Sequence, residues 1–243
     1  MQRTFRYEEM LPSEFQEAVS RMPVFFLPTG LLEWHGDHLP LGQDTLKAWG
    51  LCLETARKLG GGIVLPPHYW GRPGFSTYVG TLTFSDQALR PLFLEIFQQI
   101  EKIGGRVLLV LTGHYGPCQV DFIKSVAEQY MKRRPMLRII AQPEYEAVTV
   151  DGEQPADHAG KWETSMFWAM YPKLTRMENF RPGVVQVPQY EDAPHNHYHE
   201  PGRWEWKEDL RQTASQELGR KAIQIITDHL KSIIQAELPT ITG

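Results

Sequence analysis

The chain has 243 residues, 42% of them hydrophobic, which is enough to bury a full core within one large domain. Its formal net charge is -4 at pH 7, so it has no broad basic field that would attract nucleic-acid phosphates or anionic lipids. No stretch reaches the roughly 18 to 20 apolar residues of a membrane span, and charged residues interrupt the first ten positions, where a secretory signal would be apolar. We therefore expect a single domain over residues 1–243, with a small-molecule ligand and without nucleic-acid or membrane partners.

Cysteine usage points to a reducing compartment. Cys52 and Cys118 are the only cysteines, and neither belongs to a CxxC pair. A disulfide framework or a thiolate zinc site is therefore not expected, and the cytoplasm is the compartment that fits best.

Short apolar runs alternate with longer amphipathic stretches, a pattern typical of an α/β fold with a mainly parallel sheet. In chain order, the expected strands are residues 24–27, 63–65, 107–111 and 137–141. The expected helices are residues 45–59, 86–103, 119–131, 163–171 and 208–236. Ser85 is suited to cap the second of these helices, and glycines at 60–62 and 104–105 are suited to end the first two. Residues 171–207 show no sustained period, which predicts a long loop.

Ligand-type side chains follow three of the four expected strands. Glu33 and His35 follow residues 24–27, His68 follows residues 63–65, and His114 follows residues 107–111. In parallel α/β sheets, ligands bind beyond the carboxyl ends of the strands, so these side chains should meet at one edge. Glu33 and His35 are two residues apart and would project to the same face of an extended segment. Asp44 follows His35 after nine residues, at the start of an expected helix.

These side chains offer carboxylate oxygens and imidazole nitrogens, the ligands used for Zn²⁺ or Mn²⁺ in hydrolytic sites. Together they can hold one metal, or two metals about 3.5 to 4 Å apart if a carboxylate bridges them, and Asp44 is the candidate bridge. Each residue also has a simpler interpretation: Asp44 as a helix N-cap, His114 as a turn residue and Glu33 as a solvated loop acid. Their joint placement at strand ends favours the metal centre.

Three segments resemble the motifs of the creatininase (creatinine amidohydrolase) family. Residues 27–45, LPTGLLEWHGDHLPLGQDT, are similar to its first motif, roughly P-x-G-S-x-E-x-H-G-x-H-L-P-x-x-x-D. Residues 107–117, VLLVLTGHYGP, resemble the second, an apolar strand ending in N-G-H, and residues 157–165, DHAGKWETS, resemble the third, H-A-G-x-x-E-T-S. Gly80-Thr81 after Pro66-Pro67 also resembles the P-P…G-T connection of the family. These landmarks occur in the order of the family from about residue 23 to residue 170.

The resemblance implies a three-layer α/β/α sandwich, a centre of two divalent metals, Zn²⁺ and/or Mn²⁺, and hydrolysis of a non-peptide C–N bond in a cyclic amide or formamide. It also implies a homo-oligomer, which is a hexamer in many relatives. His158 matches the histidine that shuttles a proton during cleavage. The residues that match metal ligands of the family are Glu33, His35, Asp44, His114 and Glu163.

Two departures bear on the substrate. Thr112 stands where the second motif has Asn, and Gly116 stands where creatininase has a metal-binding Glu two residues after His114. Relatives without that Glu use the Glu of the third motif, which is Glu163 here. Gly116 weakens the assignment of creatinine as the substrate, and both departures leave open a small-molecule binding module of the same fold that has lost catalysis.

The mechanistic hypothesis is that water activated by the metals attacks the amide carbonyl while His158 protonates the departing nitrogen. Alternatively, His158 supports the centre from outside, and Asp157 fixes its tautomer in either case. Glu163 is a ligand or, failing that, the general base. Aromatic side chains that could contact a flat substrate, although buried aromatics more often belong to a core, are Trp70, Tyr78, Tyr115 and Trp162.

His195, His197 and His199 alternate in sequence and could form a second metal site. A polar loop near the active site is the interpretation that we favour.

Overall fold

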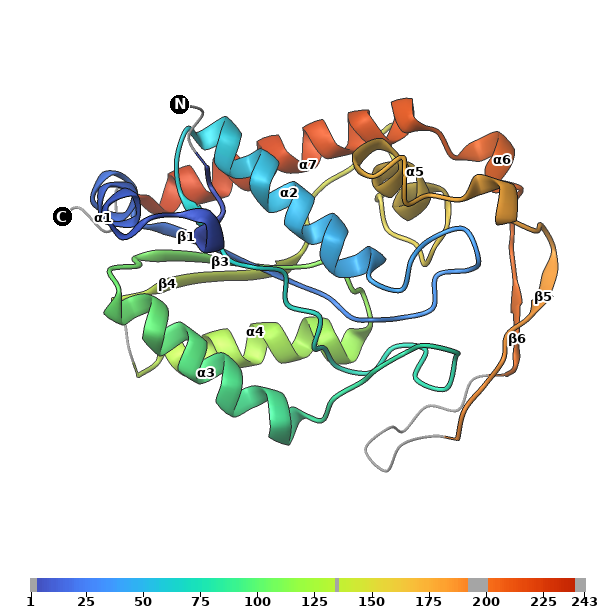
Figure 1. Cartoon of the computed structure of the whole chain (residues 1–243), viewed down its shortest axis with the longest axis horizontal. Helices are drawn as coiled ribbons and strands as arrows, with labels where there is room; N and C mark the ends of the chain where they lie inside the picture. The colour runs from blue at the N-terminus through green and yellow to red at the C-terminus, as the bar shows by residue number, and fades with distance from the viewer. Residues whose placement is uncertain (1–3, 134–135, 192–200, 239–243) are drawn as a thin grey trace.

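Four parallel strands form the centre of the fold, in the order β2-β1-β3-β4 (Figure 1). This computed structural model describes residues 4–133, 136–191 and 201–238. The strands are β1 (Val24–Thr29), β2 (Ile63–Val64), β3 (Val107–Thr112) and β4 (Arg138–Pro143), so the four expected strands are confirmed. Every residue of β1, β2 and β3 is buried, as expected for near-continuous apolar runs in a parallel sheet that is covered on both faces.

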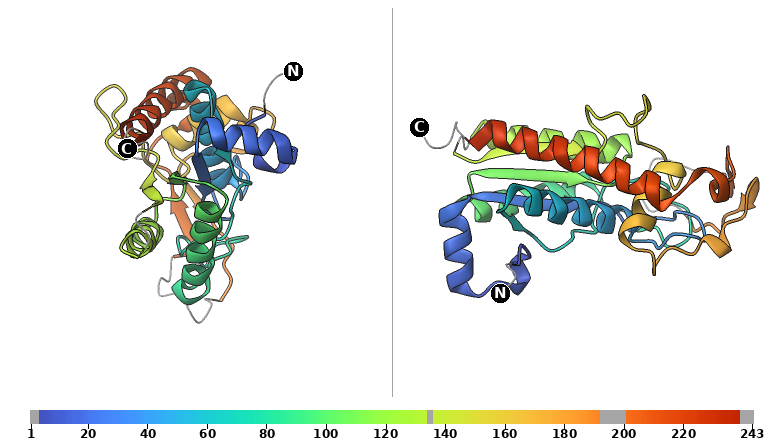
Figure 2. Two further views of the ribbon diagram at one scale, coloured as in Figure 1. Left: turned by 90° about the vertical axis from the view of Figure 1, so that its left-hand side faces the viewer. Right: turned by 90° about the horizontal axis from the view of Figure 1, so that it is seen from above.

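Helices cover both faces of the sheet, which confirms the expected α/β/α layers (Figures 1 and 2). Successive side chains of a strand point to opposite faces, so Phe26 packs in one core and Phe25 in the other. The core around Phe26 is shared with α2 (Gln43–Leu59), α5 (Lys161–Met170) and α7 (Gln216–Glu237). The core around Phe25 is shared with α1 (Pro12–Arg21), α3 (Asp86–Lys102) and α4 (Pro117–Met131). Within the described residues, no helix combines the length and apolarity needed to cross a membrane.

Two expected helix ends are confirmed in atomic detail. The Ser85 side chain accepts a hydrogen bond from the Ala88 N–H at the start of α3. Gly60 follows α2 with φ 71°, a left-handed conformation that favours glycine.

The final helix and the long loop differ from the sequence-based expectation. Residues 208–236 form two helices, α6 (Leu210–Thr213) and α7, because the chain turns at Ala214 and the Ser215 side chain caps α7 through the Leu218 N–H. Residues 171–207, expected as a loop, contain a short 3-10 helix (Met177–Asn179) and the antiparallel strands β5 (Val184–Gln186) and β6 (Arg203–Glu205). Each strand has only three residues, which is too short to establish a visible alternation.

A third apolar cluster holds the β5–β6 hairpin against the first motif. Trp34 from the motif packs edge-on against Tyr78, with ring centroids 5.2 Å apart, and stacks with Trp206 after β6 at 6.2 Å. Phe167 of α5 and Leu210 of α6 belong to the same cluster. This cluster therefore fixes the segment after β1 between the hairpin and α5.

Candidate metal centre

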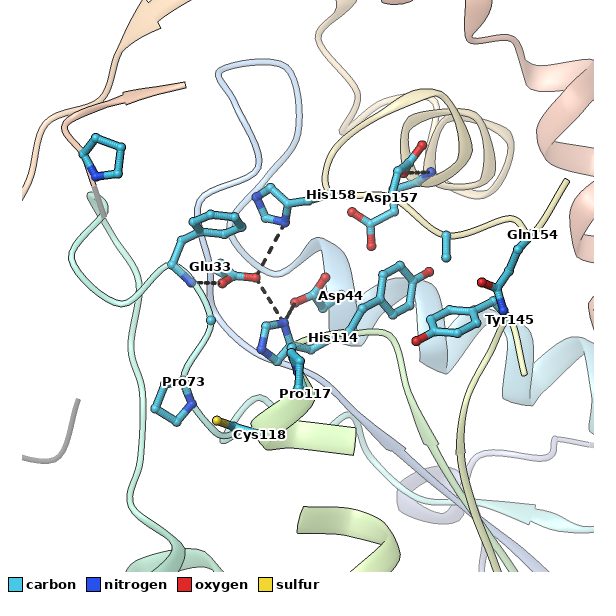
Figure 3. A pocket seen from close by; sticks show the side chains of 17 residues that line it. Glu33, Asp44, Pro73, His114, Pro117, Cys118, Tyr145, Gln154, Asp157 and His158 are labelled. Atoms are coloured by element: carbon cyan, nitrogen blue, oxygen red, sulfur yellow. Dashed lines mark hydrogen bonds and ion pairs between the residues drawn. The ribbon is translucent and has the colours of Figure 1, made fainter. Parts of the chain in front are cut away.

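Glu33, His35 and His114 meet beyond the carboxyl ends of β1 and β3, as the sequence predicts, and Figure 3 shows Glu33 and His114 together. His68, also expected at this edge, does not join them, because its ring packs edge-on against Phe93 of α3. The loop after β3 contacts the first turn of α2 so closely that a Cβ on Gly113 would lie 2.1 Å from the backbone oxygen of Asp44. Glycine is required there because any side chain would separate the two segments. This contact places His114 beside Asp44.

One group of three ligand atoms forms around His35. Its Nε2 atom lies 2.9 Å from Asp44 Oδ1 and 3.4 Å from Glu163 Oε2. His35 and Asp44 follow β1 in the sequence, whereas Glu163 lies in the first turn of α5. We call His35, Asp44 and Glu163 the first triad.

A second group forms around His114, on the other side of Asp44. His114 Nδ1 lies 3.1 Å from Glu33 Oε2 and 3.3 Å from Asp44 Oδ2 (Figure 3). We call Glu33, Asp44 and His114 the second triad. Asp44 thus directs one carboxylate oxygen into each triad, which is the arrangement required of a carboxylate that bridges two metals.

All five side chains are buried: the fully enclosed carboxylate of Glu33 is 0% exposed, and His114, the most exposed of the five, is 4% exposed. Glu33 Oε2, His35 Nε2 and both Asp44 carboxylate oxygens have no hydrogen-bond partner among the described residues. Two buried carboxylates with unsatisfied oxygens, Glu33 and Asp44, require cationic compensation. The donor set therefore fits one or two divalent cations.

The simpler interpretations of these residues are wrong. Glu33 is not a solvated loop acid, because none of it is exposed. Asp44 is not the N-cap of α2, because that position belongs to Gly42 and no side chain caps the helix. His114 lies in the loop between β3 and α4, and its ring is directed at two carboxylates.

Neighbouring groups orient the ligands. His35 Nδ1 lies 3.0 Å from the Glu33 carbonyl oxygen, which fixes a proton on Nδ1 and leaves the Nε2 lone pair for a metal. The Phe75 N–H donates to Glu33 Oε1 at 2.5 Å. A Cβ on Gly74 would lie 2.0 Å from that oxygen, so the backbone of this loop must pass directly over Glu33.

The pKa values of the clustered side chains also indicate that the site requires positive charge. Burial lowers the pKa of His114, but Glu33 and Asp44 outweigh it and raise the pKa to about 10. Burial raises the pKa of Glu163, but the Lys47 ammonium and His35 lower it to about 2. The carboxylates therefore remain charged, and without a metal the histidines take up protons in its place.

His158 lies above the second triad. Its Nε2 atom is 2.9 Å from the Trp34 carbonyl oxygen. Its Nδ1 atom is 3.9 Å from Glu33 Oε2, and Figure 3 shows this contact. Burial and the neighbouring His35 lower the pKa of His158 to about 4, so the ring is neutral at pH 7. With a proton fixed on Nε2 by Trp34, the Nδ1 lone pair faces the candidate centre.

Asp157 has a different task from the one expected. Its two carboxylate oxygens accept the backbone N–H groups of Trp162 and Glu163, at 2.8 and 3.1 Å, and so bind the start of α5. The Trp34 carbonyl, rather than Asp157, is the group that fixes the tautomer of His158.

A cavity of about 630 Å³ opens over the two triads. Of the four aromatic residues expected at the substrate, Tyr115 lines this cavity. Tyr78 lies in an adjoining cavity, also lined by His158, and its hydroxyl donates to backbone oxygens of Pro201 and Arg203.

The remaining two aromatic residues are placed away from this cavity. Trp162 belongs to the core between the sheet and α7, and Trp70 is 42% exposed and packs against Phe84. His195, His197 and His199 lie outside the described residues.

Two buried charges beside the centre, Lys47 and Glu144, were not predicted from the sequence. Glu144 follows the end of β4, so the rule that located the other candidates at strand ends also applies to it. Lys47 lies three residues after Asp44 in α2, on the same helix face, but a lysine in a helix ordinarily signals a solvent-facing position.

Comparisons with known proteins agree with the geometry. The family described as creatininase, creatinine amidohydrolase, matches residues 8–234. Creatinine amidohydrolase from Pseudomonas putida is 24% identical over 89% of this chain and 90% of its own length. The mycofactocin precursor peptide peptidase from Mycobacterium ulcerans is 26% identical over 72% of this chain and 69% of its own. A solved structure of a manganese form of creatininase matches with a TM-score of 0.77 at 21% identity, over 97% of this chain and 99% of that one, and shows the shared fold.

Proposed function

Since this chain belongs to the creatininase family, we propose that it is a metal-dependent amidohydrolase that cleaves a non-peptide C–N bond, in a cyclic amide or a formamide, of a small molecule. The observation that carries the proposal is the pair of buried triads that share Asp44, with one oxygen of Asp44 directed into each. A binding module without chemistry would not need a histidine whose Nδ1 atom faces that arrangement, as it does in His158.

The first triad, His35, Asp44 and Glu163, would hold one divalent metal, and the second triad, Glu33, Asp44 and His114, would hold the other. Mixed imidazole and carboxylate ligands suit Zn²⁺ and Mn²⁺. When bound, two such cations supply polarisation of the amide carbonyl and a water acidic enough to provide hydroxide near pH 7.

His158 would carry the proton. The Trp34 carbonyl holds the hydrogen on Nε2, so Nδ1 accepts a proton from the attacking water and donates it to the nitrogen as the C–N bond breaks. Glu163 is better suited to be a ligand than a general base. Its Oε1 atom is bound by Lys47 at 2.6 Å and its Oε2 atom accepts the Ala159 N–H at 2.7 Å, so the carboxylate has little freedom to move with a proton.

The cavity supports a small substrate. A volume of about 630 Å³ falls within the range of roughly 300 to 1,000 Å³ that is usual for small-molecule sites. Phe75, Tyr115 and Tyr145 provide ring surfaces in its wall, suited to a planar amide. The proposal does not extend to creatinine itself, because Gly116 lacks the carboxylate expected of true creatininase. Cysteine usage favours a cytoplasmic enzyme. The resemblance implies a homo-oligomer, which sedimentation analysis would test.

The direct test is a screen of zinc- or manganese-loaded protein against creatinine, formamidopyrimidines and other cyclic or formylated amides. Turnover of at least one of these amides, lost in Glu33→Gln, is the expected result. Glutamine retains the size of Glu33 and its contact with the Phe75 N–H but removes the charge facing His114. Metal-free protein that binds an amide without cleaving it would support the alternative of a binding module of the same fold.

A further inference from the structure

Lys47 is a completely buried lysine that lies behind the first triad. It is 0% exposed, and its ammonium group has three acceptors: Glu163 Oε1 at 2.6 Å, the Tyr115 hydroxyl at 2.7 Å and Glu144 Oε1 at 2.9 Å. An ammonium group has three hydrogens, so its donor capacity is fully used. Burying an ammonium group costs free energy of desolvation, so we expect the charge of Lys47 to stabilise or orient the groups around it.

The first neighbour is Glu163, whose two carboxylate oxygens have separate partners. Oε1 binds Lys47, whereas Oε2 accepts the Ala159 N–H and lies 3.4 Å from His35 Nε2. With Oε1 held, the carboxylate cannot rotate, and Oε2 alone faces the first triad. Lys47 therefore determines which oxygen of Glu163 is offered to a metal.

The second neighbour is Glu144, which forms an ion pair with the lysine. Burial raises the pKa of Glu144 to about 7, and the contacts with Lys47 and Tyr115 oppose that rise. Glu144 Oε1 accepts a hydrogen bond from the Tyr115 hydroxyl at 2.5 Å and lies 2.9 Å from Lys47. A lysine paired with Glu163 alone would neutralise that carboxylate. With Glu144 as its counter-charge, Lys47 holds Glu163 in place while the negative charge of Glu163 stays available for a cation.

The second triad is supported by other groups. The Phe75 N–H donates to Glu33 Oε1, and the Thr112 hydroxyl oxygen accepts the backbone N–H of His114 at 3.2 Å. The two triads therefore share Asp44 but differ in the residues that orient their remaining ligands.

We propose that Lys47, balanced by Glu144, is a positioning residue for the first triad, and that metal affinity at His35, Asp44 and Glu163 depends on it whereas affinity at the second triad does not. The inference rests on the proposed function, because it requires both triads to bind metal. Substitution of a group that orients a metal ligand typically weakens metal binding by on the order of 10- to 100-fold.

The test measures zinc bound per chain, by elemental analysis of protein equilibrated with buffered free Zn²⁺, in four variants. Lys47→Met removes the ammonium and keeps the bulk of the side chain. Lys47→Met/Glu144→Gln removes the ion pair while keeping the net charge of the wild type. Glu144→Gln is the single control, and Lys47→Arg restores a cationic donor. Circular dichroism and thermal unfolding of the metal-free proteins establish that each variant is folded.

We expect two zinc ions per chain in the wild type, with one of the two bound 10- to 100-fold more weakly in Lys47→Met and in the double variant, and partly recovered in Lys47→Arg. Wild-type affinity for both ions in Lys47→Met would overturn the inference and leave the proposed function standing. Full recovery in the double variant would also overturn it, because charge alone would then explain the effect. Wild-type protein that binds no zinc would refute the proposed function. If Lys47→Met does not fold, the double variant and Lys47→Arg make the same comparison.

Discussion

The Nε2 atom of His158 lies 2.9 Å from the carbonyl oxygen of Trp34, the residue between the candidate ligands Glu33 and His35. The segment that supplies two ligands therefore also orients the candidate proton carrier. The Trp34 indole ring stacks with the imidazole, with centroids 6.2 Å apart. Any movement of this segment would displace His158 and both ligands together.

Replacement of His158 tests its role as proton carrier. We expect His158→Ala to lower kcat by about 10² to 10⁴-fold, the usual contribution of general acid–base catalysis. Metal content should be unchanged, because His158 belongs to neither triad. Turnover within a few-fold of the wild type, with normal metal content in the same preparation, would remove His158 from the proton path.

Substitution of Gly74 tests whether metal binding depends on the close passage of this loop over Glu33. A Cβ at this position would lie 2.0 Å from Glu33 Oε1 and 2.4 Å from His114 Cε1, so Gly74→Ala should displace both ligands of the second triad. We expect loss of one bound metal by elemental analysis. Gly42→Ala is the matched control, since its Cβ would come no closer than 3.1 Å, to the Tyr69 ring. Equal metal content in the two variants would show that metal binding does not depend on this close passage.

Substitution of Gly116 tests whether a second-motif glutamate could replace Glu163 as the proposed ligand. We expect Glu163→Gln to lose the metal of the first triad, and Gly116→Glu not to restore it. A Cβ on Gly116 would lie 2.8 Å from His114 Nε2 and 3.1 Å from the Pro73 oxygen, so a longer side chain would push His114 away. Recovery of metal binding in Glu163→Gln/Gly116→Glu, measured by elemental analysis, would show that this crowding can be relieved.

Substitution of Asp44 tests whether one carboxylate is shared between the two proposed metal sites. Since each of its oxygens faces a different triad, Asp44→Asn should weaken both metals, whereas Glu163→Gln should weaken one. Ligands that bind only the folded state raise the unfolding temperature. Zinc should therefore raise the Tm of the wild type most, that of Glu163→Gln less, and that of Asp44→Asn least, as followed by calorimetry. Equal zinc-induced shifts in the two variants would argue against a bridging role.

The sheet and the ligands after β1 and β3 could be predicted because each depends on local sequence. Fully buried parallel strands appear as continuous apolar runs, and β1 and β3 are buried throughout. The candidate ligands Glu33 and His114 come within four residues of the ends of β1 and β3, so the strand positions also locate them.

The rest depends on contacts between distant segments. The three-residue strands β5 and β6 are stabilised by the cluster around Trp34, which no local period reveals. Lys47 is buried only because Glu144 and Glu163, about 100 residues further along the chain, lie within 2.9 Å of its ammonium group. Trp162 turns into the core because α5 packs against α7, which sequence alone does not specify.

The most direct test of the central claim, a two-metal centre bridged by Asp44, is anomalous X-ray diffraction from crystals of the zinc-loaded protein. We predict two zinc peaks about 3.5 to 4 Å apart. One should be bound by His35, Glu163 and Asp44 Oδ1, and the other by Glu33, His114 and Asp44 Oδ2. A single peak, or zinc bound away from Asp44, would contradict the claim.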